Sequence, residues 1–253
     1  MTNEAIILAA GESRRLLSYI DFPKPILQLT KIKLIQFPLL SLYLSGVKRF
    51  IVITQEKIKD KIHDALSILD DIKFDIIVND AVYRENGYSL YLGLKAAKNN
   101  IFFVSMADHI YPPDIPRKLV YVMRASNADI IIAADSKPRF VDIEEATKIK
   151  VKKDLVVRIG KKLNSFEYID AGVFFMNKKV LDSATDLIRS KEKVSVSDIV
   201  NHAIDRNYVV RIADISSVPW MDVDTPEDVK TLLQGQAKDF LQNLVDKYYN
   251  YVQ

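Results

Sequence analysis

Small and cationic residues near the start of the chain form a pattern that suits polyphosphate binding. The stretch Ala9–Lys24 reads AAGESRRLLSYIDFPK and directly follows the apolar run 5–8. Small residues let the backbone approach a ligand and point its N–H groups at phosphate oxygens. Arg15 and Lys24 add positive charge, and prolines on both sides of Lys24 restrict its backbone. The pattern favours a nucleoside triphosphate site over a solvated basic loop, and the expected contacts are Leu8, Ala9, Ala10, Gly11, Glu12, Ser13, Arg14 and Lys24.

Carboxylates follow two later apolar runs. Asp108 comes shortly after the run 101–105, and Asp222 and Asp224 stand at the end of the run 218–223. Ligands of an open α/β sheet bind beyond the carboxyl ends of its strands, and Mg²⁺ prefers hard oxygen ligands. We therefore expect Asp108 to bind Mg²⁺ beside the triphosphate. For Asp222 and Asp224 the residues alone leave open that one faces solvent and the other caps the next helix.

A third polar segment, residues 85–90 (ENGYSL), follows the apolar run 74–78. Asn-Gly is a common turn dipeptide, and Ser89 suits a helix N-cap, so the segment reads first as a turn that opens a helix. Two familiar phosphate-binding loops are excluded. The chain has no Gly-Lys-Ser/Thr sequence, and Gly11 lacks the partner glycines of a dinucleotide fingerprint.

The elements that position these residues alternate between strand and helix in the first half of the chain. This rhythm predicts an α/β, Rossmann-like fold with a mixed, mostly parallel central sheet flanked by helices. The expected strands are 5–8, 49–54, 74–78, 101–105 and 129–134. The expected helices are 32–44, with a kink at Pro38, 56–69, 89–97 and 114–125.

The second half has a more mixed pattern. Segments 149–152 and 156–159 flank a Lys-Asp turn and predict a hairpin, and helices are expected at 179–189 and 196–205. Strands are expected at 209–212 and 218–223, after which Thr225 caps a helix. We predict one domain over residues 1–253, with 229–253 a helical tail. The apolar stripe of this tail suits the core or an oligomer contact such as a homodimer.

Composition indicates a soluble globular protein that we expect in the cytoplasm. The 253 residues carry 36 Lys and Arg against 33 Asp and Glu, and the formal net charge of +3 gives no case for nucleic-acid or membrane binding. Cysteine is absent, which excludes disulfides and thiolate metal sites. No secretory signal is recognisable, and the apolar runs are too short to span a bilayer.

The N-terminal motif resembles the signature of the nucleotidyltransferases that activate sugar phosphates, isoprenoid alcohols and phosphocholine. That signature reads Leu-Ala-Ala-Gly, a small residue two positions on, Arg-Leu and then Pro-Lys-Pro. Here it falls on Leu8–Gly11, Ser13, Arg15–Leu16 and Pro23–Pro25. Ser13 is a departure, since the family usually has glycine there. The resemblance implies that Arg15 and Lys24 are catalytic, that Asp222 is the second metal ligand beside Asp108, and that the nucleobase and ribose are read near Asn86, Gly87, Ser89 and Ala107.

Further motifs resemble one family in particular, the inositol-1-phosphate cytidylyltransferases of hyperthermophilic archaea. These motifs are Asn-Gly-Tyr-Ser-Leu at 86–90, Asp-His at 108–109, Ala-Thr-Lys at 146–148, Ile-Gly-Lys at 159–161 and Trp-x-Asp-Val-Asp-Thr-Pro at 220–226. The resemblance covers residues 5–228, with Ala171 replacing the usual threonine. It implies acceptor contacts at Lys148, Lys161 or Lys162, Glu167, Asp170, Gly172 and Asp224.

The resemblance implies transfer of CMP from CTP to inositol 1-phosphate, with Mg²⁺ as cofactor and CDP-inositol and pyrophosphate as products. A separate, membrane-bound di-myo-inositol phosphate phosphate synthase is then the expected partner in making the compatible solute di-myo-inositol phosphate. Alternatives are another acceptor, such as a sugar 1-phosphate or phosphocholine, and a metal-dependent glycosyltransferase that uses the Asp-x-Asp of residues 222–224. A nonenzymatic subunit that senses CTP is a third.

Overall fold

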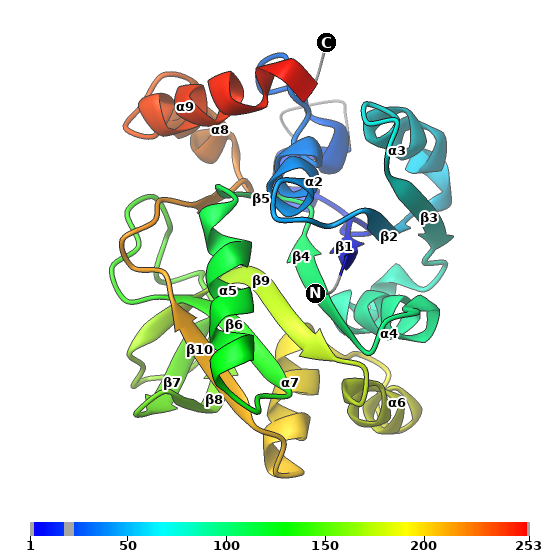
Figure 1. Ribbon diagram of the computed structural model, residues 1–253, viewed down its shortest axis with the longest axis vertical. Coiled ribbons are helices and arrows are strands. Elements are labelled where there is room, and N and C mark those ends of the chain that lie inside the picture. The colour runs from blue at the N-terminus through cyan, green and yellow to red at the C-terminus, as the bar shows by residue number, and fades with distance from the viewer. Residues whose placement is uncertain (1–2, 18–22, 252–253) are drawn as a thin grey trace.

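The computed structural model describes residues 3–17 and 23–251, which form a nine-stranded sheet with helices on both faces (Figure 1). The strand order is β3-β2-β1-β4-β9-β6-β10-β8-β7, and β9 and β8 run against the others. The strands are β1 (Glu4–Leu8), β2 (Arg49–Thr54), β3 (Lys73–Val78), β4 (Ile101–Met106), β6 (Ile130–Asp135), β7 (Lys148–Lys152), β8 (Leu155–Gly160), β9 (Tyr168–Asn177) and β10 (Val210–Asp214). The predicted fold class is confirmed, as is the hairpin of β7 and β8.

Helices cover the sheet from two sides and enclose two apolar cores. One core takes buried side chains from α2, α3, α5 and α9, and the other from α4, α6 and α7. Strand β1 is buried on both faces: Ala5 and Ile7 join the first core, and Ile6 and Leu8 join the second. The helices are α1 (Arg14–Leu17), α2 (Gln36–Tyr43), α3 (Lys59–Leu66), α4 (Asn86–Ala96), α5 (Asp114–Ala125), α6 (Val180–Ser190), α7 (Val196–Asp205), α8 (Pro226–Leu233) and α9 (Lys238–Tyr248).

The sheet register gathers the ends of several strands at one edge. Strand β1 pairs in parallel with β2 and β4, so Leu8 lies beside Ile53 and Met106. Strand β9 runs antiparallel between β4 and β6, and its Asp170 pairs with Ala134 near the end of β6. The start of β9 therefore lies beside the carboxyl ends of its neighbours, where a ligand of this kind of sheet binds.

The predicted strand 218–223 is much shorter in the structure. Only β11 (Met221–Asp222) forms, and it pairs with β5 (His109–Ile110) apart from the main sheet. Pro219 has no N–H to donate to a ladder, and the N–H of Val218 is used by the carbonyl of Ile215 in a turn. In this small sheet Asp222 lies opposite His109.

The helix expected at 32–44 is shorter in the structure, where α2 begins at Gln36 and contains Pro38 in its first turn. Residues before it form an isolated bridge between Gln28 and Lys33 instead. Pro38 falls in the first turn of α2, where backbone N–H groups have no partner within the helix. The proline therefore costs no helical hydrogen bond there.

The C-terminal segment is helical and packs onto the protein rather than away from it. Thr225 caps α8 through a capping box with Asp228, as predicted from the sequence. The apolar side of α9 is buried, and the hydroxyl of its Tyr248 lies 2.6 Å from the hydroxyl of Ser41 in α2. Figure 1 shows α9 above the site edge of the sheet, beside α2.

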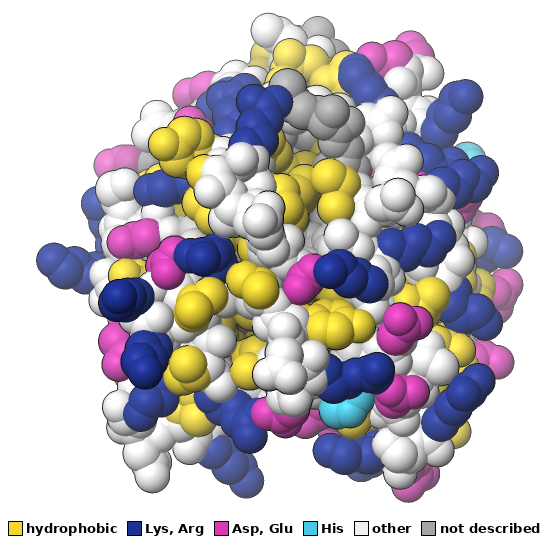
Figure 2. All heavy atoms as spheres, turned by 60° about the horizontal axis from the view of Figure 1, so that its bottom comes forward, with side chains coloured by type: hydrophobic (Ala, Val, Ile, Leu, Met, Phe, Trp, Pro, Cys, Tyr) yellow, Lys and Arg dark blue, Asp and Glu magenta, His cyan; other side chains and the backbone are white. Residues whose placement is uncertain are grey.

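Charged side chains of both signs alternate over the face shown in Figure 2, with small apolar patches between them. This distribution agrees with the small formal net charge of +3. Within residues 3–17 and 23–251, no helix combines the length and apolar character that crossing a bilayer requires.

Candidate active site

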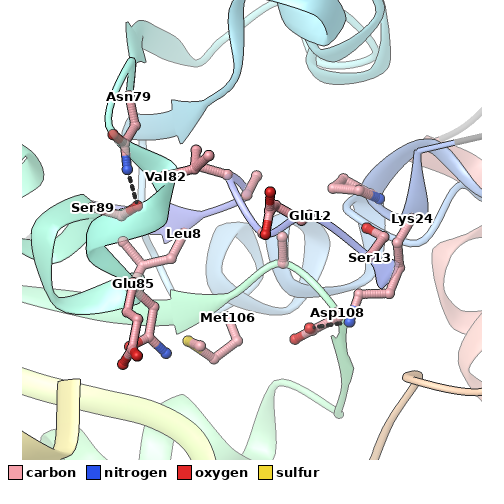
Figure 3. Close-up of a pocket in the computed structure, with 16 residues that line it drawn as sticks. Leu8, Glu12, Ser13, Lys24, Asn79, Val82, Glu85, Ser89, Met106 and Asp108 are labelled. Carbon is pink, nitrogen blue, oxygen red and sulfur yellow. Dashed lines mark hydrogen bonds and ion pairs between the residues drawn. The ribbon is translucent and has the colours of Figure 1, made fainter. Parts of the chain in front are cut away.

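A pocket of about 310 Å³ opens at the carboxyl ends of β1 and β4 (Figure 3). Its walls come from the loop after β1, from the turn that carries Lys24, from the segment between β3 and α4, and from the end of β4. Most of the predicted nucleotide contacts line it together. They are Leu8, Ala9, Ala10, Gly11, Glu12, Ser13, Lys24, Asn86, Ser89, Ala107 and Asp108.

The loop after β1 keeps its backbone close to this pocket. The side-chain amide of Gln55 donates to the carbonyl of Ala10 (2.8 Å) and fixes the loop from behind. Ser13 has a φ of 57°, in the left-handed region that glycine adopts without steric cost. This backbone angle explains the preference for glycine at this position of the signature. In this chain the loop adopts the same kind of angle with serine. A Cβ added at Gly11 would meet no protein atom within 4 Å, so the pocket has room there for a ligand.

Lys24 lies between two carboxylates. Its Nζ is 2.5 Å from Oδ2 of Asp108 and 2.5 Å from Oδ1 of Asp224. Burial alone would lower the pKa of Lys24, but the two carboxylates raise it above its ordinary value. Burial alone would raise the pKa of Asp108, but Lys24 and His109 hold it well below its usual range. Both groups are therefore charged near neutral pH.

His109 holds Asp108 from the other side, with its Nδ1 2.7 Å from Oδ1 of Asp108. The imidazole stacks on Trp220, whose Nε1 donates to a carboxylate oxygen of Asp135 (2.8 Å). Gly172 has a φ of 68°, and a Cβ there would lie 2.5 Å from Nε2 of His109. Burial would lower the pKa of His109, but Asp108 and the neighbouring carboxylates raise it to about 9. A charged imidazole, held between a ring and a glycine, thus orients Asp108.

A second pocket, of about 520 Å³, adjoins the first and shares Asn86, Met106 and Asp108 with it. Among the predicted acceptor contacts, those that line it are Lys161, Asp170, Gly172 and Asp224. Acidic side chains outnumber basic ones along its wall. The acidic residues are Asp108, Asp142, Glu145, Asp170, Asp222, Asp224, Glu227 and Asp228, against Arg15, His109 and Lys161.

Lys148 and Glu167, two further predicted acceptor contacts, line neither pocket. The Lys148 ammonium is buried and donates to the carbonyls of Glu144 (3.1 Å) and Lys161 (3.0 Å). A carboxylate oxygen of Glu167 accepts from the N–H of Val151 (2.8 Å). In this arrangement Lys148 ties Lys161 to the loop beside the second pocket, and direct contacts of Lys148 and Glu167 with an acceptor stay predictions.

Gly87 and Arg14 also stand apart from the lining of the nucleotide pocket. A Cβ on Gly87 would lie 2.4 Å from the carbonyl oxygen of Val194, so glycine is needed there for close packing against that backbone. The side chain of Arg14 is outside the described part of the chain. The role of each residue toward the nucleotide stays a prediction.

The nucleotide pocket also contains residues that the sequence analysis missed. Asn79 is buried, and its amide donates to the hydroxyl of Ser89 (2.9 Å). It directly follows β3, so the rule that ligands bind beyond strand ends would have identified it. Glu85 lines the same pocket with a φ of 68°, and no feature of the sequence indicates that backbone angle. Helix α4 begins at Asn86, so Ser89 is not its cap.

Asp108 and Asp222 are brought together by the pairing of β5 with β11, in which the N–H of Val223 donates to the carbonyl of Asp108 (3.0 Å). Burial raises the pKa of Asp222, and the charges of Asp224 and Asp108 raise it further. In the part of the chain that the structure describes, no three His, Cys, Asp or Glu side chains converge on one metal position. One or two carboxylates are, however, the usual protein share of a Mg²⁺ site, with substrate phosphates and water completing it. The donor set fits a Mg²⁺ ion held jointly with a triphosphate.

Comparison with known families identifies the kind of domain that this chain forms. The MobA-like NTP transferase domain matches residues 5–207 of this chain. The chain belongs to this family. The signature that the sequence analysis identified lies within the matched residues, and much of it lines the first pocket at the strand ends.

Individual relatives show which transferases this chain resembles. Proteins named bifunctional IPC transferase and DIPP synthase match from Aquifex aeolicus (29% identical; 98% of this chain, 56% of that protein) and Archaeoglobus fulgidus (33% identical; 90% and 42%). The chain spans about half the length of these curated relatives. The solved structure of the inositol-1-phosphate CTP transferase from T. maritima superimposes with a TM-score of 0.86, at 28% identity over 97% of each chain. HddC from Yersinia pseudotuberculosis shares the fold, with a TM-score of 0.71 at 20% identity over 94% of this chain and 100% of that one.

Asp170 gives a pH-dependent test of the buried, acidic character of the second pocket. Burial raises its pKa to about 6 from an ordinary value of 3.8, although the N–H of Gly172 donates to it. Its ionised form therefore destabilises the fold by about 1–3 kcal/mol above pH 6, and this cost disappears near pH 4. We expect Asp170→Asn to raise Tm by several degrees at pH 8 and by little at pH 4, as measured by calorimetry. An equal shift at both pH values would contradict this burial effect.

Proposed function

We propose that this transferase moves CMP from CTP to inositol 1-phosphate and releases CDP-inositol and pyrophosphate. The observation that carries the proposal is that Asp108 lines both pockets, with Lys24 2.5 Å away in the first pocket and Asp222 in the second. The match to relatives named IPC transferase and to the inositol-1-phosphate CTP transferase supports the choice of substrates. The first pocket suits a nucleoside triphosphate, and the second suits a phosphorylated polyol.

In the proposed reaction an oxygen of the acceptor phosphate attacks the α-phosphorus of CTP in line. The bond between the α-phosphorus and its bridging oxygen breaks, and pyrophosphate leaves. Lys24 and Arg15 hold the triphosphate and its leaving group, and no covalent intermediate with the protein is needed. Catalysis then rests on positioning and on stabilisation of charge in the transition state.

Asp108 and Asp222 would hold the Mg²⁺ ion that we propose as cofactor. When bound, the ion supplies neutralisation of charge on the reacting phosphates. His109 keeps one oxygen of Asp108 occupied (Nδ1–Oδ1 2.7 Å), which leaves the other oxygen directed to the Lys24 side. His109 and Lys24 thereby fix the orientation of the Asp108 carboxylate.

The acidic wall of the second pocket supports a polyol rather than a second polyanion as the body of the acceptor. Carboxylates accept hydrogen bonds from hydroxyl groups, and Asp142 and Asp170 both line that wall. Lys161, on the same wall, is the cation that we propose for the acceptor phosphate. Phosphocholine also suits an acidic pocket, because its ammonium group would be stabilised there.

The names of the curated relatives couple an IPC transferase with a DIPP synthase. We propose that a DIPP synthase consumes the CDP-inositol made here. The phosphoanhydride bond of CDP-inositol makes it a suitable donor: a hydroxyl of a second inositol phosphate would attack the phosphorus attached to inositol, and CMP would leave.

Pyrophosphate release with Mg²⁺ tests the proposal. Each of the four nucleoside triphosphates is paired with inositol 1-phosphate, glucose 1-phosphate, mannose 1-phosphate and phosphocholine. We expect release with CTP and inositol 1-phosphate. Release with a different pair would replace the substrates but keep the mechanism, and no release with any pair would overturn the assignment as a nucleotidyltransferase.

Asp108→Asn tests the metal ligand. The variant lacks one negative charge at the junction of the pockets, so we expect kcat to fall on the order of a thousandfold. Asp239→Asn, in the exposed first turn of α9, is the matched control and should keep wild-type kcat within about twofold. Retained kcat in Asp108→Asn, with Mg²⁺ varied over a wide range, would remove Asp108 from the metal site.

A further inference from the structure

Asp224 and Arg15 both line the second pocket, yet the carboxylate of Asp224 also contacts Lys24, which lines the first pocket. We propose that Asp224 is a positioning residue that holds Arg15 and Lys24 in one fixed arrangement for the triphosphate. The inference rests on the proposed nucleotidyltransfer and assigns Asp224 to the donor nucleotide instead of the acceptor.

Both oxygens of the Asp224 carboxylate are engaged by these cations. Oδ1 lies 2.5 Å from Nζ of Lys24, and Oδ2 lies 2.5 Å from Nη2 of Arg15. The side chain of Lys24 is only 10% exposed and that of Asp224 28% exposed, so the pair of Lys24 and Asp224 differs from an ordinary surface ion pair. The Arg15 side chain is 49% exposed and also lies 3.8 Å from Oε2 of Glu145, and Lys24 also contacts Asp108. Asp224 is the carboxylate that contacts both of these cations.

The backbone around Asp224 is itself held on both sides. The N–H of Asp224 donates to the carboxylate of Asp228 (2.9 Å), which also accepts from the N–H of Thr225 (2.7 Å) in the capping box of α8. On the other side, the N–H of Val223 donates to the carbonyl of Asp108 (3.0 Å). The carboxylate thus projects from a short segment fixed between a helix cap and the β5–β11 sheet.

This arrangement has an electrostatic consequence that separates binding from catalysis. A carboxylate beside a triphosphate repels it, so Asp224 weakens binding of the nucleotide in its ground state. Its benefit is preorganisation, since Arg15 and Lys24 need no rearrangement as negative charge moves to the leaving pyrophosphate. Removing the carboxylate should leave nucleotide affinity intact or improve it while lowering kcat. An acceptor contact would instead change the KM of the acceptor.

The test compares wild type, Asp224→Asn and Asp224→Glu, with Asp239→Asn as the surface-charge control. Calorimetric titration with CTP and Mg²⁺ gives the Kd, and pyrophosphate release gives kcat and the KM of inositol 1-phosphate. For Asp224→Asn we expect a Kd for CTP that is unchanged or up to about tenfold lower, and a kcat that is about 10- to 100-fold lower. The KM of inositol 1-phosphate should stay within about twofold, and Asp224→Glu should recover part of kcat.

Two results would overturn the inference. One is a tenfold or larger rise in the KM of inositol 1-phosphate with Kd for CTP and kcat retained, which assigns Asp224 to the acceptor. The other is a kcat within about twofold of wild type, which removes it from catalysis. Circular dichroism checks that each variant is folded. If Asp224→Asn does not fold, the Kd, kcat and KM of Asp224→Glu are compared with those of wild type instead. Wild-type inactivity with CTP and inositol 1-phosphate would reject the substrates instead, and the comparison would then use the active pair.

Discussion

The ammonium of Lys24, held between the carboxylates of Asp108 and Asp224, is the contact on which the site depends. It joins the turn at Lys24–Ile26, the segment just after β4 and the segment before α8, which are far apart in the sequence. Because the lysine is largely buried, loss of either carboxylate leaves a charge poorly compensated, and such losses are costly. The same contact joins the cation that we propose for the triphosphate to the carboxylate that we propose for the metal, so the two proposed sites form one unit.

The topology explains how this unit arises. Parallel β1 and β4 end side by side, so the small residues after β1 and Asp108 after β4 meet at one edge. Antiparallel β9 then delivers Asp170 and Gly172 to the same edge from the opposite direction. Gly172 is required there because the imidazole of His109 occupies the space that a Cβ would take. Two adjoining pockets that share Asp108 follow from this meeting of strand ends.

Much of this arrangement can be predicted from the sequence, because apolar runs and strand ends are local signals. Buried β1 and β4, the Thr225 cap and most of the residues lining the first pocket follow from such signals, whereas Glu85 does not. The shortening of the predicted strand 218–223 to β11 is harder to predict. It depends on Pro219, which lacks an N–H, and on a turn at Val218. The start of α2 at Gln36 is likewise set by neighbouring structure. The contacts of Asp224 with Arg15 and Lys24 depend on three-dimensional proximity across the chain, which spacing in one sequence cannot reveal.

The most direct measurement is anomalous diffraction from crystals grown with Mn²⁺ and a non-hydrolysable CTP analogue. The anomalous peak locates the metal, and the electron density of the same crystal locates the lysine ammonium. We expect the Mn²⁺ peak in contact with the carboxylates of Asp108 and Asp222 and with triphosphate oxygens, and the ammonium of Lys24 on a phosphate. A Mn²⁺ ion bound by the triphosphate alone, with Lys24 remote from every phosphate, would contradict the assignment of this junction as the catalytic centre.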